Sequence, residues 1–190
     1  SHGYSHIPIF KLKPKECKKD ISHSISLLED IIGVPVIGYR APDFSITKKT
    51  IWALDILEQC GIKYDSSIFP INGKRYGIQD SKRYPYKIDG KNLIELPMTT
   101  YQLFSQNIPA CGGGYLRLYP IKLTKMIMNK TNKSGKPVVM YLHPYELNIT
   151  EMRRIKHKYD ISFRFYVNQS LNRTTVLKKL KDRSKLLKKV

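Results

Sequence analysis

The chain has 190 residues, of which 41% are hydrophobic, and this is enough for one domain with a real core. No apolar run reaches the ~18 residues that a membrane-spanning helix needs, so no transmembrane segment is expected. The three cysteines (Cys17, Cys60 and Cys111) cannot all pair with one another and show no CxxC spacing, which argues against a disulfide framework.

The formal net charge is +19, and the excess is concentrated in the last part of the chain. Residues 153–190 contain 13 Lys and Arg but only 2 Asp and Glu. Such a stretch suits a nucleic acid, an acidic glycan or an anionic membrane surface, and it equally suits a lysine-rich solvated face. No zinc-finger, RRM or helix-turn-helix signature accompanies the charge, so we expect no specific nucleic-acid binding.

Helices and strands are expected to alternate in the first half of the chain. Apolar periodicity predicts helices over 20–32, capped by Asp20 and ended by Gly33, and over 47–60. Short buried strands are predicted over 35–42 and 62–70. This order favours an α/β fold with a parallel sheet.

The later part of the chain predicts a hairpin over 86–97 that turns at Asp89-Gly90, and a helix that begins near Pro120. A strand over 138–147 and a basic amphipathic helix over 174–189 follow. The glycine-rich stretch CGGGYLRLYP (111–120) either lets a ligand approach closely or makes a tight turn. It matches no phosphate-loop pattern.

His2 and His6 are candidate metal ligands. Their spacing places two imidazoles on one face if the stretch is helical. Imidazoles suit Zn, Co, Ni or Fe, but a catalytic metal usually has a third protein ligand. The alternative is a chance spacing of core or surface histidines.

Three polar residues follow predicted strands, where α/β sheets build their active sites: Arg40, Asp65 and His143. Arg40 can grip a carboxylate, Asp65 can orient a histidine, and His143 stands where a general acid is expected, with Glu146 as a weaker supporting candidate. Each has a structural alternative, namely a surface ion pair, a capping aspartate or a packed histidine.

The motifs SHGYSH, GYRAPDF, KYDSSIFP and YLHPYEL, in this order, resemble those of the NodB-homology polysaccharide deacetylases, carbohydrate esterase family 4. The stretches ELPMTTY, CGGGYLRLYP and FRFYVN further resemble a subgroup associated with exopolysaccharide gene clusters. The resemblance covers residues 1 to about 170. It implies an irregular seven-stranded (β/α) barrel, N-terminally incomplete in this chain, with a partial deacetylase domain over 1–170 and a basic helix over 171–190.

The resemblance also implies roles for individual residues. His2 and His6 would ligate a divalent metal, zinc first, with Co²⁺, Ni²⁺ or Fe²⁺ as alternatives. Arg40 would tune the catalytic base, Asp65 would pair with His143, and His143 would protonate the leaving amine. The substrate contacts would be Leu142, at the acetyl methyl group, and the groove aromatics Tyr39 and Phe69. His2, His6 and His143 are therefore expected to converge on one acetamide-sized pocket.

The implied function is metal-dependent removal of N-acetyl groups from a polysaccharide. O-Deacetylation and a non-catalytic glycan-binding module are the alternatives. The family's aspartate pair, which supplies the base and the third metal ligand, has no match here. We therefore expect that this chain is the later part of a longer protein, with natural loss as the rival explanation, and that alone it turns over little. The substrate chemistry suggests an envelope or exopolysaccharide role, while the polymer and the oligomeric state stay open.

Overall fold

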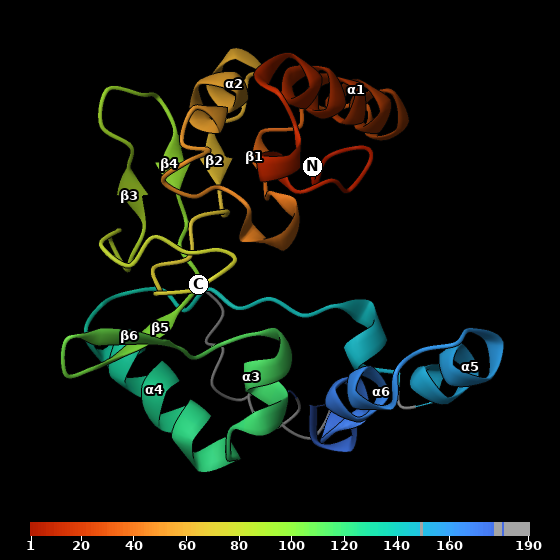
Figure 1. The fold of residues 1–190 in the computed structure, drawn as a ribbon. Coiled ribbons are helices and arrows are strands. Elements are labelled where there is room, and N and C mark those ends of the chain that lie inside the picture. Colours follow the sequence, from red (N-terminus) through yellow and green to blue (C-terminus); the bar gives the residue numbers. More distant parts are fainter. Residues whose placement is uncertain (149, 177–179, 181–190) are drawn as a thin grey trace. The chain divides into compact units, whose positions relative to one another are not determined.

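The computed structural model describes residues 1–148, 150–176 and 180. The chain divides into two compact units, Ser1–Pro109 and Ala110–Val190 (Figure 1). The boundary expected near residue 170 stays a prediction. Most of the predicted C-terminal helix lies outside the described residues. Within them, no helix is both long and apolar enough to cross a bilayer.

The first unit contains a four-stranded sheet with two helices. The strands, in the order β1-β2-β4-β3, are Gly38–Tyr39, Tyr64–Asp65, Ile94–Glu95 and Tyr86–Lys87. The pairs β1–β2 and β2–β4 are parallel, and β3–β4 is antiparallel. The helices are α1 (Pro14–Ile32) and α2 (Ala53–Gln59), with short 3₁₀ turns at Ile9–Lys11 and Pro42–Phe44. The parallel pairing and the predicted hairpin are both confirmed.

The helix α1 begins six residues before its predicted start. Pro14 occupies its first position, where a missing N–H is harmless, and the Glu16 carboxylate accepts the Lys13 N–H at 2.8 Å. Asp20 therefore lies inside the helix, and its prediction as the N-cap was wrong. Gly33 ends α1 as predicted, in the left-handed conformation (φ 71°).

The regular parts of β1 and β2 are only two residues each, shorter than predicted. Pro42 has no N–H to donate to a ladder, which ends the first strand. After Asp65, the Ser66 and Ser67 hydroxyls take over the bonds that link neighbouring strands. Side-chain hydroxyls thus continue the links between strands beyond the end of the regular ladder. A further antiparallel pair, β5 (Thr100–Leu103) and β6 (Gln106–Pro109), was not predicted.

The core of the first unit forms where α1 and α2 pack together. Its members share nearly complete burial and include Cys17, Ile21, Leu54, Leu57, Ile62 and Leu93. Of the apolar positions that predicted the two helices, Ile21, Ile25, Leu54 and Leu57 are buried, whereas Ile32 and Ile51 are exposed.

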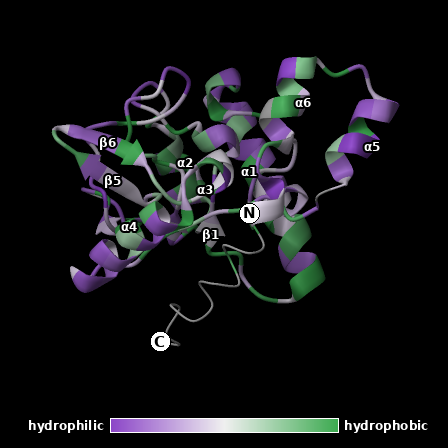
Figure 2. Cartoon of the chain, turned by 90° about the horizontal axis from the view of Figure 1, so that it is seen from below, coloured by the Kyte–Doolittle hydropathy of each residue, from purple (hydrophilic) through white to green (hydrophobic). Residues whose placement is uncertain are grey.

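The second unit is mainly helical. Its helices are α3 (Gly113–Leu118), α4 (Ile121–Lys133), α5 (Glu151–Lys158) and α6 (Phe163–Ser170), with a 3₁₀ turn at Pro144–Glu146. The predicted helix after Pro120 is confirmed, and Pro120 is its N-cap. The predicted strand over 138–147 is reduced to a single bridge between Tyr141 and Gly112, because the 3₁₀ turn begins at Pro144. The short α5 is largely hydrophilic, with Met152 as its buried residue (Figure 2).

Replacing Leu57 by alanine should destabilise the first unit by about 2–5 kcal/mol, because Leu57 is fully buried in the α1–α2 core. Urea unfolding followed by the fluorescence of Trp52, the single tryptophan, reports this unit. The matched control is Leu27→Ala on α1, whose side chain is 43% exposed and whose effect should stay within about 0.5 kcal/mol. Equal losses for the two variants would contradict this assignment of the core.

Candidate active site

His2 and His6 meet, but not on a helix. Residues 1–8 form a loop in which Gly3 (φ 76°) and His6 (φ 52°) adopt left-handed conformations. The ring centroids lie 4.9 Å apart, edge to face. The predicted pairing of the two imidazoles is therefore present, while the helical geometry that would have explained it is not.

The loop is fixed by Asp20 of α1. The two Asp20 carboxylate oxygens accept the N–H groups of Tyr4 and Ser5, each at 2.9 Å. A Cβ at Gly3 would come within 2.8 Å of Asp20 Oδ2, so a larger residue would push the loop off its anchor. Asp20 thus supports the segment between the two histidines instead of capping a helix.

His2 is also oriented by the backbone of Arg40. Its Nδ1 lies 2.6 Å from the Arg40 carbonyl oxygen. Because a carbonyl can only accept, Nδ1 carries the hydrogen and Nε2 keeps the lone pair. Burial lowers the pKa of His2, which favours the neutral ring that a metal requires. A backbone acceptor behind the ring is the usual support of a metal-ligating histidine.

The donor set at this loop suits a metal but is not complete. Within the described part of the chain, no group of three or more His, Cys, Asp or Glu side chains could hold an ion. A catalytic zinc usually has three protein ligands, so two imidazoles fit as part of such a site. A catalytic zinc at this loop would need a further ligand.

The end of the parallel sheet holds Arg40 through Ser66. Arg40 Nε donates to the Ser66 carbonyl at 3.0 Å, and Nη2 donates to the Ser66 hydroxyl at 2.7 Å. That hydroxyl donates in turn to the Leu96 carbonyl at 2.6 Å. The guanidinium is therefore fixed against β2 and β4, and its predicted grip on a catalytic carboxylate stays a prediction.

Asp65 and Glu95 form a buried carboxyl pair at the same sheet edge. They are partners in the β2–β4 register, and both are 0% exposed. Asp65 Oδ1 accepts the Ser67 hydroxyl at 2.5 Å, and Glu95 Oε1 accepts the Ile68 N–H at 3.0 Å. Among the described residues, Asp65 Oδ2 and Glu95 Oε2 have no such donor. A hydrogen bond between the two carboxyl groups requires one of them to carry a proton.

The two carboxyls titrate as a unit. Burial raises the pKa of Asp65 to about 6, although hydrogen bonds from Ser67 and its neighbours oppose the shift. Burial, and then repulsion from Asp65, raises the pKa of Glu95 well above its ordinary value. Sequence reasoning missed Glu95. The available signal was its place in ELP, a carboxyl near the end of the predicted hairpin and directly before Leu96-Pro97.

Tyr39 and Phe69, the predicted groove aromatics, are both buried. Tyr39 is 4% exposed and belongs to the core, and Phe69 is 2% exposed and packs against Phe44 and Tyr76. Burial to this degree favours a packing role. Their contact with substrate stays a prediction.

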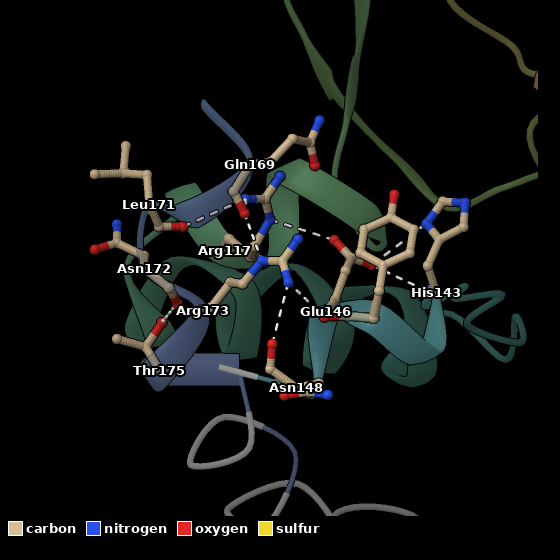
Figure 3. A network of polar contacts seen from close by, with 10 residues as sticks. Arg117, His143, Glu146, Asn148, Gln169, Leu171, Asn172, Arg173 and Thr175 are labelled. Carbon is tan, nitrogen blue, oxygen red and sulfur yellow. Dashed lines mark hydrogen bonds and ion pairs between the residues drawn. The ribbon is translucent and has the colours of Figure 1, made fainter. Parts of the chain in front are cut away.

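In the second unit, His143 stands between two tyrosines. Its ring stacks on Tyr145 at a centroid distance of 4.8 Å and meets Tyr141 edge-on at 5.6 Å, and its side chain is 49% exposed. The buried Glu146 carboxylate lies beside it (Figure 3). Leu142, the predicted acetyl-pocket residue, is partly exposed. The His143 ring is thus accessible to solvent, although it packs between two tyrosines.

The glycine-rich stretch supports the backbone that carries His143. Gly112 (φ 143°) bridges to Tyr141, and the Gly113 N–H donates to the Tyr141 carbonyl at 3.2 Å. A Cβ at Gly113 would lie 2.6 Å from the Tyr141 hydroxyl, and one at Gly112 would overlap the Tyr141 ring. The glycines therefore allow the close approach of an aromatic ring of this chain. Contact with a sugar is not needed to explain them.

The structure brings some of the predicted site residues together. His2, His6 and Arg40 meet in the first unit, and Ser66 and Ser67 connect Arg40 with Asp65 at the sheet edge. His143 and Leu142 belong to the second unit. The expected convergence of His143 with His2 and His6, and the pairing of His143 with Asp65, stay predictions.

Two family models match successive parts of the chain. Residues 1–64 match the family model for polysaccharide deacetylase, and residues 66–187 match a model described as a domain of unknown function, DUF3473. The peptidoglycan deacetylase-like protein FGM2 of Gibberella zeae is 34% identical over 67 residues, which is 35% of this chain and 19% of that protein.

The fold resembles that of a candidate polysaccharide deacetylase from Mycobacterium smegmatis, known from a crystal structure. The TM-score is 0.56 at 20% sequence identity, and the match covers 98% of this chain and 56% of the other. This likeness confirms the predicted fold class. The chain spans about half the length of that structure and about a fifth of the Gibberella protein.

The buried carboxyl pair should make folding stability fall as the pH rises. The folded protein holds protons that unfolded carboxyls release near pH 4, so stability is lost as the pH rises from about 4 through the folded pKa values. Tyr39 and Tyr86 also face the pair but carry raised pKa values and stay neutral. In Glu95→Gln, an uncharged amide replaces the protonated acid. The free energy of unfolding should therefore fall by roughly 1–3 kcal/mol less between pH 5 and 8 than it does in the wild type.

Urea unfolding monitored at Trp52 measures this difference. Asp30→Asn makes the equivalent acid-to-amide change at an exposed position on α1 and should keep the wild-type pH dependence. If Glu95→Gln and Asp30→Asn follow the wild-type profile equally, the pair does not hold a proton in the folded state.

Proposed function

The chain belongs to the DUF3473 family, with its first 64 residues in the polysaccharide deacetylase family, and we propose that it carries the catalytic part of a metal-dependent polysaccharide N-deacetylase. The substrate would be an N-acetylated polysaccharide or oligosaccharide. The observation that supports this best is the His2–His6 pair, which lies in the matched segment with Nε2 of His2 left available by the Arg40 carbonyl.

The metal would be a divalent ion, zinc first, with Co²⁺, Ni²⁺ or Fe²⁺ as alternatives, since imidazole suits all of these. His2 and His6 would hold it. When bound, it would supply Lewis-acid activation of water and of the acetyl carbonyl. The 190 residues alone should bind metal weakly and turn over little, because the described residues bring two imidazoles together and not three ligands.

Hydrolysis breaks the acetamide C–N bond, with water adding to the carbonyl carbon. The nitrogen leaves readily only when it is protonated, and we assign that proton to His143, whose ring is half exposed. Arg40 would hold and tune the carboxylate that serves as the catalytic base. Asp65 would support His143, and Leu142 would line the space for the acetyl methyl group. The products are acetate and a free amino sugar.

The DUF3473 match extends over more than half of the chain, in the part where the motifs resemble those of exopolysaccharide-associated deacetylases. We therefore assign an exopolysaccharide or envelope polymer as the substrate class. The same groups could remove an O-acetyl ester, where protonation of the leaving group matters less. Acetate release from matched N- and O-acetylated oligosaccharides separates the two reactions.

Acetate release from N-acetylated oligosaccharides by the complete gene product tests the proposal. His143→Asn should lower kcat by about 10²–10⁴-fold, the usual effect of losing a general acid. His2→Ala should weaken Zn²⁺ binding in calorimetric titration and abolish zinc-dependent turnover. His157→Asn, on the exposed side of α5, is the matched control and should leave both measurements unchanged.

Three outcomes would contradict the proposal. One is acetate release that persists in His2→Ala or after chelation of the metal. Another is robust turnover by the 190-residue chain alone, which would refute the expected need for further ligands. Sugar binding that is independent of metal, with no acetate released, would instead identify a glycan-binding module.

A further inference from the structure

Glu146 is a buried carboxylate placed directly behind the imidazole of His143. Its side chain is 1% exposed, yet both oxygens have partners (Figure 3). Oε1 lies 3.3 Å from Arg117 Nε, and Oε2 accepts the backbone N–H of His143 at 3.0 Å. The same Oε2 lies 3.5 Å from His143 Nδ1. The carboxylate therefore joins a buried guanidinium to a half-exposed imidazole.

The local backbone fixes the position of the Glu146 carboxylate beside His143. Pro144 begins a 3₁₀ turn, the Glu146 N–H donates to the His143 carbonyl at 2.9 Å, and the Glu146 side chain returns to the His143 N–H. This reciprocal arrangement closes a small ring that contains both residues. The Glu146 side chain cannot move far without breaking a bond in that ring, while the His143 imidazole is held by its contacts with Tyr141 and Tyr145.

The buried charge of Glu146 is balanced by a guanidinium that is itself held in place. Arg117, 5% exposed, pairs with Glu146 and donates from Nη1 to the Gln169 carbonyl at 2.9 Å. The neighbouring Arg173 donates to the carbonyls of Tyr145 (2.7 Å) and Asn148 (3.1 Å), which flank Glu146. A buried carboxylate without such partners would be strongly unfavourable. The network is thus suited to keeping one carboxylate at one position.

We propose that Glu146 is the positioning residue for His143, and that Arg117 fixes Glu146 for this role. The carboxylate faces Nδ1, so the neutral ring carries its hydrogen there and Nε2 is the nitrogen that exchanges protons with substrate. When the ring is protonated, the same carboxylate stabilises the imidazolium. The 3.5 Å separation exceeds that of a charge-assisted bond, as catalytic contacts often do before substrate binds.

This inference deepens the proposed function and rests on His143 as the general acid. It assigns to Glu146, within the second unit, the supporting role that the family resemblance gives to Asp65. The two assignments differ experimentally, since Asp65→Asn should leave the His143 tautomer unchanged if Glu146 sets it.

Nitrogen-15 NMR of histidine-labelled, full-length protein tests the tautomer directly. In the wild type, neutral His143 should carry its hydrogen on Nδ1. In Glu146→Gln, the amide oxygen should turn to the charged Arg117 at the loss of the bond from the His143 N–H. The NH₂ group then faces Nδ1, and the ring should switch to the Nε2–H form. The kcat of deacetylation should fall by roughly 10²–10⁴-fold, with KM nearly unchanged, as for a triad histidine held in the wrong tautomer.

Glu151→Gln, at the start of α5 in the same unit, is the matched control and should leave tautomer and kcat as in the wild type. A wild-type ring with its hydrogen on Nε2 would overturn the inference even if Glu146→Gln did not fold. An unchanged tautomer in a folded Glu146→Gln would overturn it as well. If the tautomer switches while His143→Asn retains full turnover, Glu146 positions the ring as proposed and the general-acid role of His143 is wrong.

Discussion

The hydrogen bonds across the ends of β1, β2 and β4 are the constraint on which the first unit depends. Ser66 accepts from Arg40 and donates to the Leu96 carbonyl, so one hydroxyl ties three neighbouring strands where their regular ladder stops. Beside it, Asp65 and Glu95 are buried in register. Every polar group at this edge needs a partner, since water is excluded. The fixed position of Arg40 is therefore a property of the sheet edge and not of one ion pair.

Arg40 connects that edge to the histidine loop. Its side chain binds Ser66, while its carbonyl accepts from His2. Asp20 holds the loop from the other side through the Tyr4 and Ser5 amides. The orientation of the His2 ring is thus set by a strand end and a helix face that fold together around one core. Such rigidity would suit a metal-binding loop, since preorganised ligands bind an ion more tightly.

Sequence reasoning succeeded where the determining interactions are local or repeated along the chain. Periodicity predicted α2, α4 and the hairpin, and the order of the motifs predicted the family. It failed where a long-range partner decides. Asp20 has a good N-cap side chain, but its amide partners lie in a loop 16 and 15 residues away. Glu95 lies in a segment whose sequence indicates only a strand. It forms a buried carboxyl pair because the β2–β4 register places Asp65 beside it.

Two buried glutamates show why residue type alone could not assign the site. Glu95 and Glu146 are both almost fully buried. Glu95 faces another acid, so burial and repulsion raise its pKa and a hydrogen is held between the two carboxyls. Glu146 faces Arg117 on one side and donors of His143 on the other, so it serves as an acceptor. A carboxyl facing an acid stores a proton, and one facing a guanidinium can orient an imidazole. The partner across the contact therefore decides the chemistry.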